Sequence, residues 1–460
     1  MAQPQMRTST APGGSSNAAG EPPARSVSGF GQLAGGWVSR LTSGRGSTPF
    51  RLRGALIGTI VFALIFAVLG AYGVGKRHSS IDATNHAAGQ LLQLQDIRMS
   101  VVQADSLASR LYLTGGAEDP AARQKYLGFI GAASTELVDV ALQLDLGADQ
   151  AKALQQANAG LAAYTGLIEQ ARANNRQGFP VGAAYQRQAN AAVGQLVGQL
   201  RVVEQSQRDA VDDELGAAHR AGAWLALAGW MLVAVLVLAG LWLAMRFRRW
   251  VNLPLGVGLV VVVVVLVLAT LAQGRSVNDA DDAVSSSLTT ADLVAQARAA
   301  AFDAQSQEAL TLINRGNGAA NEAKWADASA VVDAALGEAC DRDSSSACGL
   351  QRTYGEYVSG HEQIRTYDDG GDWDTAVAVS LGRASATSDP AADVSVTVVP
   401  FTAFDTTSTQ VVQTSSAAAT SALSDATNGL ALMRVLVFLA GILVVVLASV
   451  GFGQRLREYR

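Results

Sequence analysis

Residues 54–75 read GALIGTIVFALIFAVLGAYGVG, a run of 22 residues without a charged side chain. An α-helix rises about 1.5 Å per residue, so about 20 apolar residues cross the roughly 30 Å hydrocarbon core of a bilayer. A spanning segment must be helical, because lipid offers the backbone no hydrogen-bonding partner. The run therefore predicts a transmembrane helix. A signal peptide has a shorter apolar stretch close to the chain start, whereas 53 residues precede this run.

Three similar runs follow at 224–245, 253–272 and 433–452, apart from Arg434 at the edge of the last. Val260–Val265 is β-branched and would favour a strand in water, but hydrophobicity overrides that preference in a bilayer. The whole chain is 49% hydrophobic and only 16% charged, whereas soluble proteins carry about 25% charged residues. We therefore expect a multi-pass membrane protein whose four transmembrane helices lie in the lipid bilayer.

The distribution of arginine predicts the orientation, since short cytoplasmic segments are enriched in Lys and Arg. The first 53 residues hold six arginines and one acid, Glu21. Three arginines lie in the link 246–252 and three more in the hook 453–460. Lys76, Arg77 and Arg275 give a weaker opposing signal. We therefore expect a cell-membrane protein with both termini in the cytoplasm and with the segments 76–222 and 274–431 outside.

The two long segments echo each other in the same order. Residues 111–113 (LYL) match 310–312 (LTL), and 121–126 (AARQKY) match 320–325 (ANEAKW). At an offset shorter by six, Tyr164, Glu169, Gln170 and Arg172 match Tyr357, Glu362, Gln363 and Arg365. Each likeness is weak, but their common order predicts an internal duplication.

Each copy has the pattern of a helical bundle. Apolar residues recur at three- and four-residue spacing from Leu91 to Leu111, which predicts that the first span continues as one long helix. Asp119-Pro120 is a helix start, and further helices are expected at about 122–144, at 151–176 and from 181 into the second span. The second copy should be interrupted between Ser385 and Pro400, where Ser, Thr and Pro gather.

The predicted fold is therefore an all-α membrane protein. It has four transmembrane helices and two tandem extracytoplasmic antiparallel four-helix bundles, related by internal duplication.

Cys340 and Cys348 are the only cysteines. Because the extracytoplasmic side is oxidising, we expect them to form a disulfide, with two free thiols as the alternative. The segment 274–431 holds 22 acidic and 8 basic residues. This excess of acidic residues could indicate a cation site or a basic partner. More often, such an excess is simply an acidic surface in contact with solvent.

Residues 1–50 are rich in Gly, Ser, Pro and Ala, which predicts a disordered cytoplasmic tail. Within it, Phe30, Leu33, Trp37 and Leu41 fall on one helical face. They could form a short helix that docks a cytoplasmic partner or lies on the inner leaflet. The intervening glycines leave an unstructured tail as an equal alternative.

The sequence gives no reason to expect catalysis. It contains no GxxxxGK[ST], GxSxG or HExxH motif, and no HxxxH pair among His78, His86, His219 and His361. We therefore expect no catalytic residue, no cofactor, no metal ion and no nucleic acid partner. The spans carry no internal acid or base of the kind that transport paths use, which also disfavours a transporter.

The order span, bundle, span resembles the extracytoplasmic sensor modules of chemoreceptors and histidine kinases. Residues 110–116 (RLYLTGG) followed by Lys125-Tyr126 look like the helix-turn-helix corner of such modules. Those receptors continue into cytoplasmic signalling domains, for which the short inner segments here leave no room.

Four spans, tandem outer domains and a disordered N-terminus together resemble the actinobacterial GlnX-like proteins. That resemblance implies a relay of glutamine, glutamate or aspartate availability from an extracytoplasmic solute-binding lipoprotein to a cytoplasmic serine/threonine kinase. No functional residue can be transferred from it.

The favoured function is thus a non-catalytic transmembrane signal transducer, in which one chain replaces the two subunits of a dimeric receptor. A structural or scaffold protein of envelope assembly is the alternative.

Overall fold

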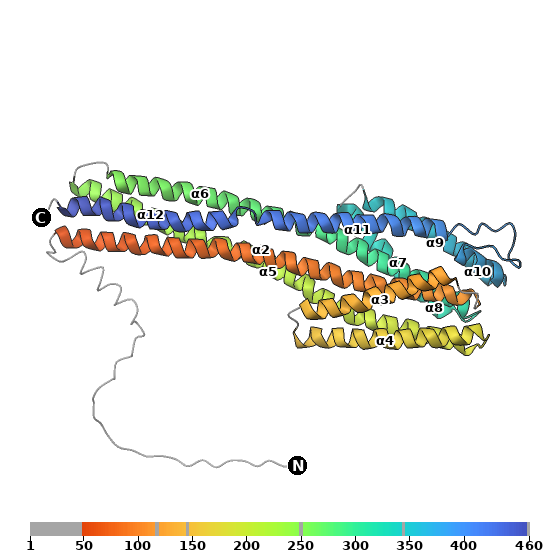
Figure 1. The fold of residues 1–460 in the computed structure, drawn as a ribbon. Coiled ribbons are helices and arrows are strands. Elements are labelled where there is room, and N and C mark those ends of the chain that lie inside the picture. The colour runs from red at the N-terminus through yellow and green to blue at the C-terminus, as the bar shows by residue number, and fades with distance from the viewer. Residues whose placement is uncertain (1–47, 116–118, 144–146, 248–251, 343–345, 458–460) are drawn as a thin grey trace, which may run out of the picture.

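The computed structural model describes residues 48–115, 119–143, 147–247, 252–342 and 346–457. These residues form helices and turns without any strand (Figure 1). The helices are α2 (Thr48–Leu113), α3 (Pro120–Gln143), α4 (Ala148–Arg176), α5 (Val181–Phe247), α6 (Leu253–Asp282), η1 (Ala283–Leu288), α7 (Thr289–Ile313), α8 (Ala319–Arg342), α9 (Ala347–Asp369), α10 (Trp373–Leu381), α11 (Val398–Ala426) and α12 (Leu430–Arg457).

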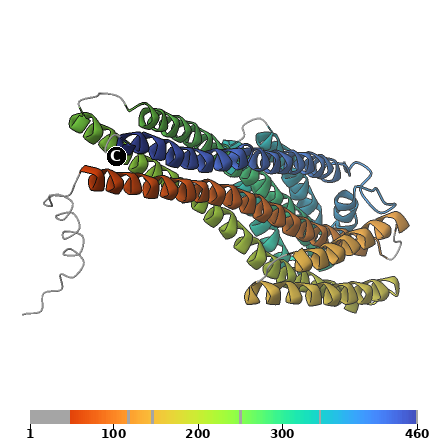
Figure 2. The same ribbon diagram turned by 60° about the vertical axis from the view of Figure 1, so that its left-hand side comes forward.

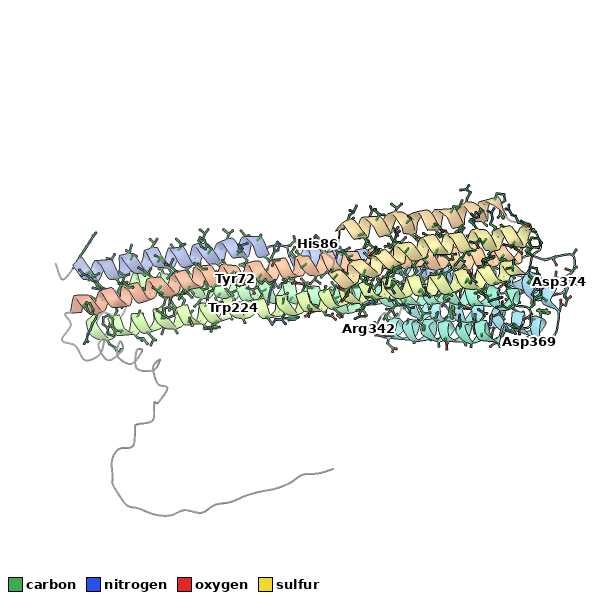
Figure 3. The ribbon with its side chains drawn as sticks, turned by 90° about the horizontal axis from the view of Figure 1, so that it is seen from below. Tyr72, His86, Trp224, Arg342, Asp369 and Asp374 are labelled. Atoms are coloured by element: carbon green, nitrogen blue, oxygen red, sulfur yellow. A yellow bond between two sulfur atoms is a disulfide. The ribbon has the colours of Figure 1, made fainter. Side chains whose placement is uncertain are left out.

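The molecule is elongated and has an apolar half and a bundle half (Figures 1 and 2). In the apolar half, α6, α12, the first part of α2 and the last part of α5 lie side by side. The bundle half holds all remaining helices. In Figure 3, Tyr72 and Trp224 lie in the apolar half, whereas Asp369 and Asp374 lie at the opposite end of the molecule, here called the distal end.

The apolar half has the surface of a membrane protein. Most of the large apolar side chains that are exposed belong to the four predicted spans, for example Leu238, Val260 and Leu439. Between helices the packing is close. A Cβ atom added to Gly441 of α12 would come within 2.6 Å of the Ala67 Cβ of α2. Four helices are long and apolar enough to cross a bilayer, which confirms the expectation of an all-α membrane protein.

Two of the long helices pass from the apolar half into the bundle half without interruption, as the sequence predicted for both. α2 has 66 residues and α5 has 67, so each is about 100 Å long at 1.5 Å per residue. Arg77 lies buried where the halves meet. Its guanidinium donates hydrogen bonds to the carbonyls of Ala218 (2.9 Å) in α5 and Gln273 (2.6 Å) in α6. This side chain therefore links three helices at the junction.

The other two passages between the halves are irregular, which the sequence analysis did not predict. The π-helix η1 separates α6 from α7, and the Thr289 hydroxyl donates to the Val284 carbonyl five residues earlier. Between α11 and α12 the chain turns through 427–429, where Gly429 has φ +82°. An L side chain is strained at this backbone angle, so glycine is the residue that permits the break.

In the bundle half, the two predicted bundles are packed on each other. The first bundle consists of α3, α4 and the bundle-half parts of α2 and α5. The second consists of α7 to α11. One hydrophobic core runs through both, because α2 packs against α7. Polar contacts cross the same interface, including Ser106 Oγ to Gln305 Oε1 (2.6 Å) and Arg208 to Asp292 (2.7 Å).

The predicted interruption in the second bundle is present. α10 ends at Leu381, and α11 begins at Val398, two residues before Pro400. Hydrogen bonds hold the irregular segment between them to α10: the Asp389 amide donates to the Thr375 hydroxyl (2.7 Å), and the Thr397 hydroxyl donates to the Val379 carbonyl (2.8 Å). In the second bundle a loop thus separates α10 from α11. In the first bundle the last helix, α5, is continuous.

Candidate functional site

A small cavity lies near the distal end of the first bundle. Its volume is about 30 Å³, and α2, α3, α4 and α5 all contribute to its wall. The lining residues are Ala108, Leu111, Tyr112, Arg123, Tyr126, Ile168, Arg172, Asn175, Arg176 and Gln186. A water needs about 10–15 Å³ of such space, so the cavity as it stands has room for about two waters.

Three arginines make the wall of this cavity strongly basic. Arg123 comes from α3, and Arg172 and Arg176 lie one turn apart on α4. Glu169 forms ion pairs with both Arg123 and Arg172, and its own side chain is half exposed. These hydrogen bonds and charges outweigh the burial of the carboxyl and lower the pKa of Glu169. Three arginines and the Glu169 carboxylate thus meet at this end of the first bundle.

Buried polar groups extend inward from the cavity. Tyr126, which lines the cavity, and Tyr164 of α4 are buried, and their hydroxyls interact with each other. Asp105 of α2 lies close enough to both tyrosines to influence their pKa. Burial raises the pKa of Asp105 to about 6, although its hydrogen bonds to Ser306, Asn190 and Tyr164 oppose that rise. Such groups are normally satisfied by protein, water or ligand.

Asp105 also contacts the second bundle. Its Oδ2 accepts hydrogen bonds from Asn190 Nδ2 (2.9 Å) in α5 and from Ser306 Oγ (2.7 Å) in α7. Ser306 is in turn within 3.1 Å of Ser109 Oγ, to which Gln186 of the cavity wall donates (3.0 Å). Hydrogen bonds therefore connect the cavity wall with the second bundle.

At the position that the sequence repeat pairs with this cavity, the second bundle is filled. His361 of α9 is buried between two carboxylates, 3.0 Å from Glu308 Oε2 and 2.9 Å from Glu322 Oε1. Its ring stacks on Trp325 with 3.7 Å between centroids. Burial opposes the charge of His361, but the hydrogen bonds to both glutamates outweigh it and raise the pKa to about 9. A cation held by two carboxylates of its own chain needs no charged ligand.

The residues matched in the sequence repeat occupy like places in the two bundles. Tyr126 and Trp325 are buried in the second helix of each bundle, and Tyr164 and Tyr357 in the third. Arg123, in contrast, pairs with Glu322 in the alignment. The charge at this position is thus opposite in the two bundles. The duplication itself stays a prediction.

The predicted disulfide joins Cys340 at the end of α8 to Cys348 at the start of α9. The proposed docking residues Phe30, Leu33, Trp37 and Leu41 lie outside the described residues. Sequence reasoning missed the cavity. Arg172 and Tyr126 were noted only as repeat markers, although Arg123/Tyr126 and Arg172/Arg176 have the helical spacings that place charged and aromatic groups on one face.

Comparison with known proteins finds one family. Residues 80–216, which include the whole cavity wall, match the model of an actinobacterial sensor domain. No curated protein and no solved structure matches the chain. Together with the four long apolar helices, this match supports an actinobacterial sensor membrane protein.

Proposed function

We propose that the protein is a non-catalytic transmembrane sensor that detects an extracytoplasmic solute or solute-binding protein and relays its presence to a cytoplasmic partner. The observation that carries this proposal is the continuity of α2 and α5, which run from the arginine-lined cavity of a sensor domain into the apolar half. A shift at one end of such a helix displaces the other end, as in known switching transitions.

The proposed orientation places both bundles outside the cell membrane and both termini in the cytoplasm. All four apolar segments lie side by side, and both bundles project from the same end of them, so both bundles occupy one side of the bilayer (Figure 1). The arginines of the link and the hook then face the cytoplasm, as the positive-inside rule requires.

The packing of α2 on α7 supports a chain that acts as a fused dimer. Ser106 and Gln305, which bond to each other, differ by 199 residues, the same offset that relates 111–113 to 310–312. Equivalent positions meet in this way at the two-fold axis of a symmetric dimer. We propose that a duplicated sensor unit folded against its own copy and that the signal crosses as a change in their packing.

For the partners, we propose an extracytoplasmic solute-binding protein and a cytoplasmic serine/threonine kinase in amino-acid sensing. The test is cross-linking in intact cells with a membrane-impermeant and a membrane-permeant reagent, followed by purification of the full chain and mass spectrometry. A solute-binding protein cross-linked from outside and a kinase cross-linked from inside would support the relay. Cell-wall synthesis enzymes as the main partners would instead indicate the scaffold function and contradict the proposal.

A further inference from the structure

We propose that a groove between the two bundles binds a small solute that carries both a carboxylate and an ammonium group. This open groove is formed by α2 and α5 of the first bundle and by α7 and α8 of the second. Its volume is about 550 Å³, and small-molecule sites in proteins measure about 300–1,000 Å³. The inference rests on the proposed sensor function and names the chemistry of the signal and the place where it binds.

The interface between the bundles has a second groove, here called the closed groove. It is formed by α2 and α3 of the first bundle and by α7 and α11 of the second. The sequence repeat exchanges these helices with those of the open groove, since it pairs α2 with α7, α3 with α8 and α5 with α11. The closed groove has a volume of only about 140 Å³. The two grooves are thus equivalent in position but differ in free space.

Aromatic side chains fill the closed groove. Phe129 of α3, Phe302 of α7 and Phe401 of α11 line it. The rings of Phe302 and Phe401 pack edge to face, with 5.0 Å between their centroids. The sequence repeat, continued beyond residue 325, pairs Phe129 with Ala328 of α8. A methyl group therefore lines the open groove where its counterpart has a phenyl ring.

Other small residues keep the open groove wide. The shortest side chains of its wall come from α5, α7 and α8, and they are Ala191, Gly194, Ala299, Ala300 and Ala328. At Gly194 an added Cβ atom would meet no other atom within 4 Å. The chain itself therefore leaves space in this groove that a solute can occupy.

The wall of the first bundle presents positive charge to the open groove. Arg98 of α2 and Arg201 of α5 both line it. Arg98 is 3% exposed, and its Nε lies 3.3 Å from Glu204 Oε1. Its Nη2 is buried without a hydrogen-bond partner among the described residues. A buried charged donor without an acceptor is unfavourable, so a carboxylate in the groove would supply what this atom lacks.

The wall of the second bundle presents two carboxylates, Asp303 of α7 and Asp327 of α8, beside the ammonium group of Lys324. Asp303 accepts a hydrogen bond from Gln307 Nε2 (3.0 Å). Partial shielding from water raises the pKa of Asp303, and this hydrogen bond and the charges of Lys324 and Arg201 oppose the rise. An ammonium group in the groove would donate charge-assisted hydrogen bonds to these carboxylates.

The two walls together select a solute with charges of both signs. A solute with a single charge would find its counter-charge on one wall only. A carboxylate facing Arg98 and Arg201, with an ammonium group facing Asp303 and Asp327, would use both. Such a solute would bridge the first bundle and the second, so its binding would act directly on the packing that the proposed signal changes.

The test is isothermal titration calorimetry on the full chain in lipid nanodiscs at pH 7, without partner proteins. The probes are the twenty amino acids, β-alanine and γ-aminobutyrate. For each probe that binds, the analogue without its ammonium group and the analogue without its carboxylate serve as controls, as acetate and methylamine do for glycine. We expect at least one probe to bind with one site per chain, and its single-charge analogues to bind about tenfold more weakly or less.

Two glycine variants locate the site. Gly194→Leu should fill part of the open groove and weaken binding about tenfold or more. The helix should tolerate it, because leucine is a better helix former than glycine and the space around Gly194 is free. Gly166→Leu is the matched control, since Gly166 of α4 also has nothing within 4 Å of an added Cβ atom and does not line the groove. It should leave binding unchanged.

Charge variants test the two walls. Arg201→Gln and Asp303→Asn remove one charge from each wall, and each should weaken binding about tenfold or more. Lys125→Gln removes a charge from the closed groove and should leave binding unchanged. Thermal unfolding checks that each variant is folded, and Gly194→Leu decides the matter if a charge variant is not.

Three results would overturn the inference: no probe binds the wild type below about 10 mM, the single-charge analogues bind as tightly as the solute with both charges, or Gly194→Leu binds like the wild type. Since the titration uses no partner, its failure leaves the sensor function open through a carrier protein. The cross-linking experiment tests that function separately.

Discussion

At the residue scale, the two bundles compensate buried charge in different ways. His361 has its two counter-charges in Glu308 and Glu322, and the Tyr357 and Ser380 hydroxyls complete the shell around Glu308 at 3.1 and 2.8 Å. In the first bundle, the half-exposed Glu169 pairs with Arg123 and Arg172.

The raised pKa of His361 predicts a pH-dependent stability. Its ordinary pKa is 6.5 and its folded pKa is about 9. The stabilisation from protonated His361 is therefore complete below pH 6.5 and is lost as the pH rises through 9. Relative to His361→Gln, the wild type should lose about 1–3 kcal/mol of unfolding free energy between pH 6.5 and about pH 10. Denaturant unfolding at both pH values measures the difference.

The control for this experiment is His86→Gln, because His86 is an exposed histidine of α2 that pairs with Asp82 of the same helix. This variant should keep the wild-type dependence on pH. Parallel pH profiles for the wild type and His361→Gln would show that the histidine is not charged in its buried site.

How much of the site could be predicted differs from residue to residue. The Cys340–Cys348 bond followed from the compartment that the spans imply. The cavity could not be predicted, since Arg123 and Arg172 converge only once α3 and α4 are packed, and no motif fixes that packing. The His361 cluster was hidden for the same reason: Glu308, Glu322 and His361 come from α7, α8 and α9.

At the scale of elements, the disulfide closes a short connection between α8 and α9. The two cysteines are eight residues apart, so a chain-entropy estimate gives about 2–3 kcal/mol of stabilisation at most. Replacing both by serine should lower the unfolding free energy of the bundle half within that limit and leave its helix content unchanged. Denaturant unfolding followed by circular dichroism measures both, and a variant that fails to fold would contradict this limited role.

The continuity of α5 is also testable by single substitutions. Ala221 is buried at the junction beside Arg77, and its carbonyl oxygen would lie 2.9 Å from a Cβ atom added to Gly73. Proline in a helix interior removes a hydrogen bond and clashes with the preceding turn, at a cost of about 3 kcal/mol or more. Ala221→Pro should therefore expose the amides around the junction to fast hydrogen exchange, while those of the first bundle stay protected.

Ala431→Pro is the matched control, since Ala431 lies in the first turn of α12, directly after the break at 427–429. Proline is tolerated in a first turn, where the amide has no helical partner. Exchange of the neighbouring amides in α12 should change little. Equal exchange in Ala221→Pro and the wild type would mean that the junction of α5 is already open and does not act as a continuous helix.

Secondary structure was the part that the sequence predicted best. The start of α5 and the end of α4 agree with the apolar periodicity and with the glycine and proline residues between them. The break before α12 was missed, although Asn428-Gly429 is a turn dipeptide, because apolar spacing continues on both sides. The π-helix was missed because it differs from an α-helix only in the spacing of its backbone hydrogen bonds, which span five residues instead of four. Its amino-acid composition does not distinguish it.

At the scale of the whole molecule, the proposed orientation is the first property to test. Cysteine placed at Ser15, in the part of the chain outside the described residues, should resist a membrane-impermeant thiol reagent in intact cells. Cysteine at Ser286, an exposed residue of η1, should react. Both changes are made with Cys340 and Cys348 replaced by serine. The reverse labelling pattern would place the bundles inside the cell and contradict the arginine rule.

The ion pairs of His361 with Glu308 and Glu322 also bear on how steeply the protein would respond to the concentration of a solute. A sensor with two equivalent pockets can bind cooperatively and respond steeply to its ligand. Here, among the described residues, the chain's own carboxylates hold His361 at one of the two matched positions, and the cavity considered lies at the other. Occupancy of one independent site rises from a tenth to nine-tenths over a roughly 80-fold range of concentration, with a Hill coefficient of about 1. Such a protein would report the level of its solute gradually rather than switch at a threshold.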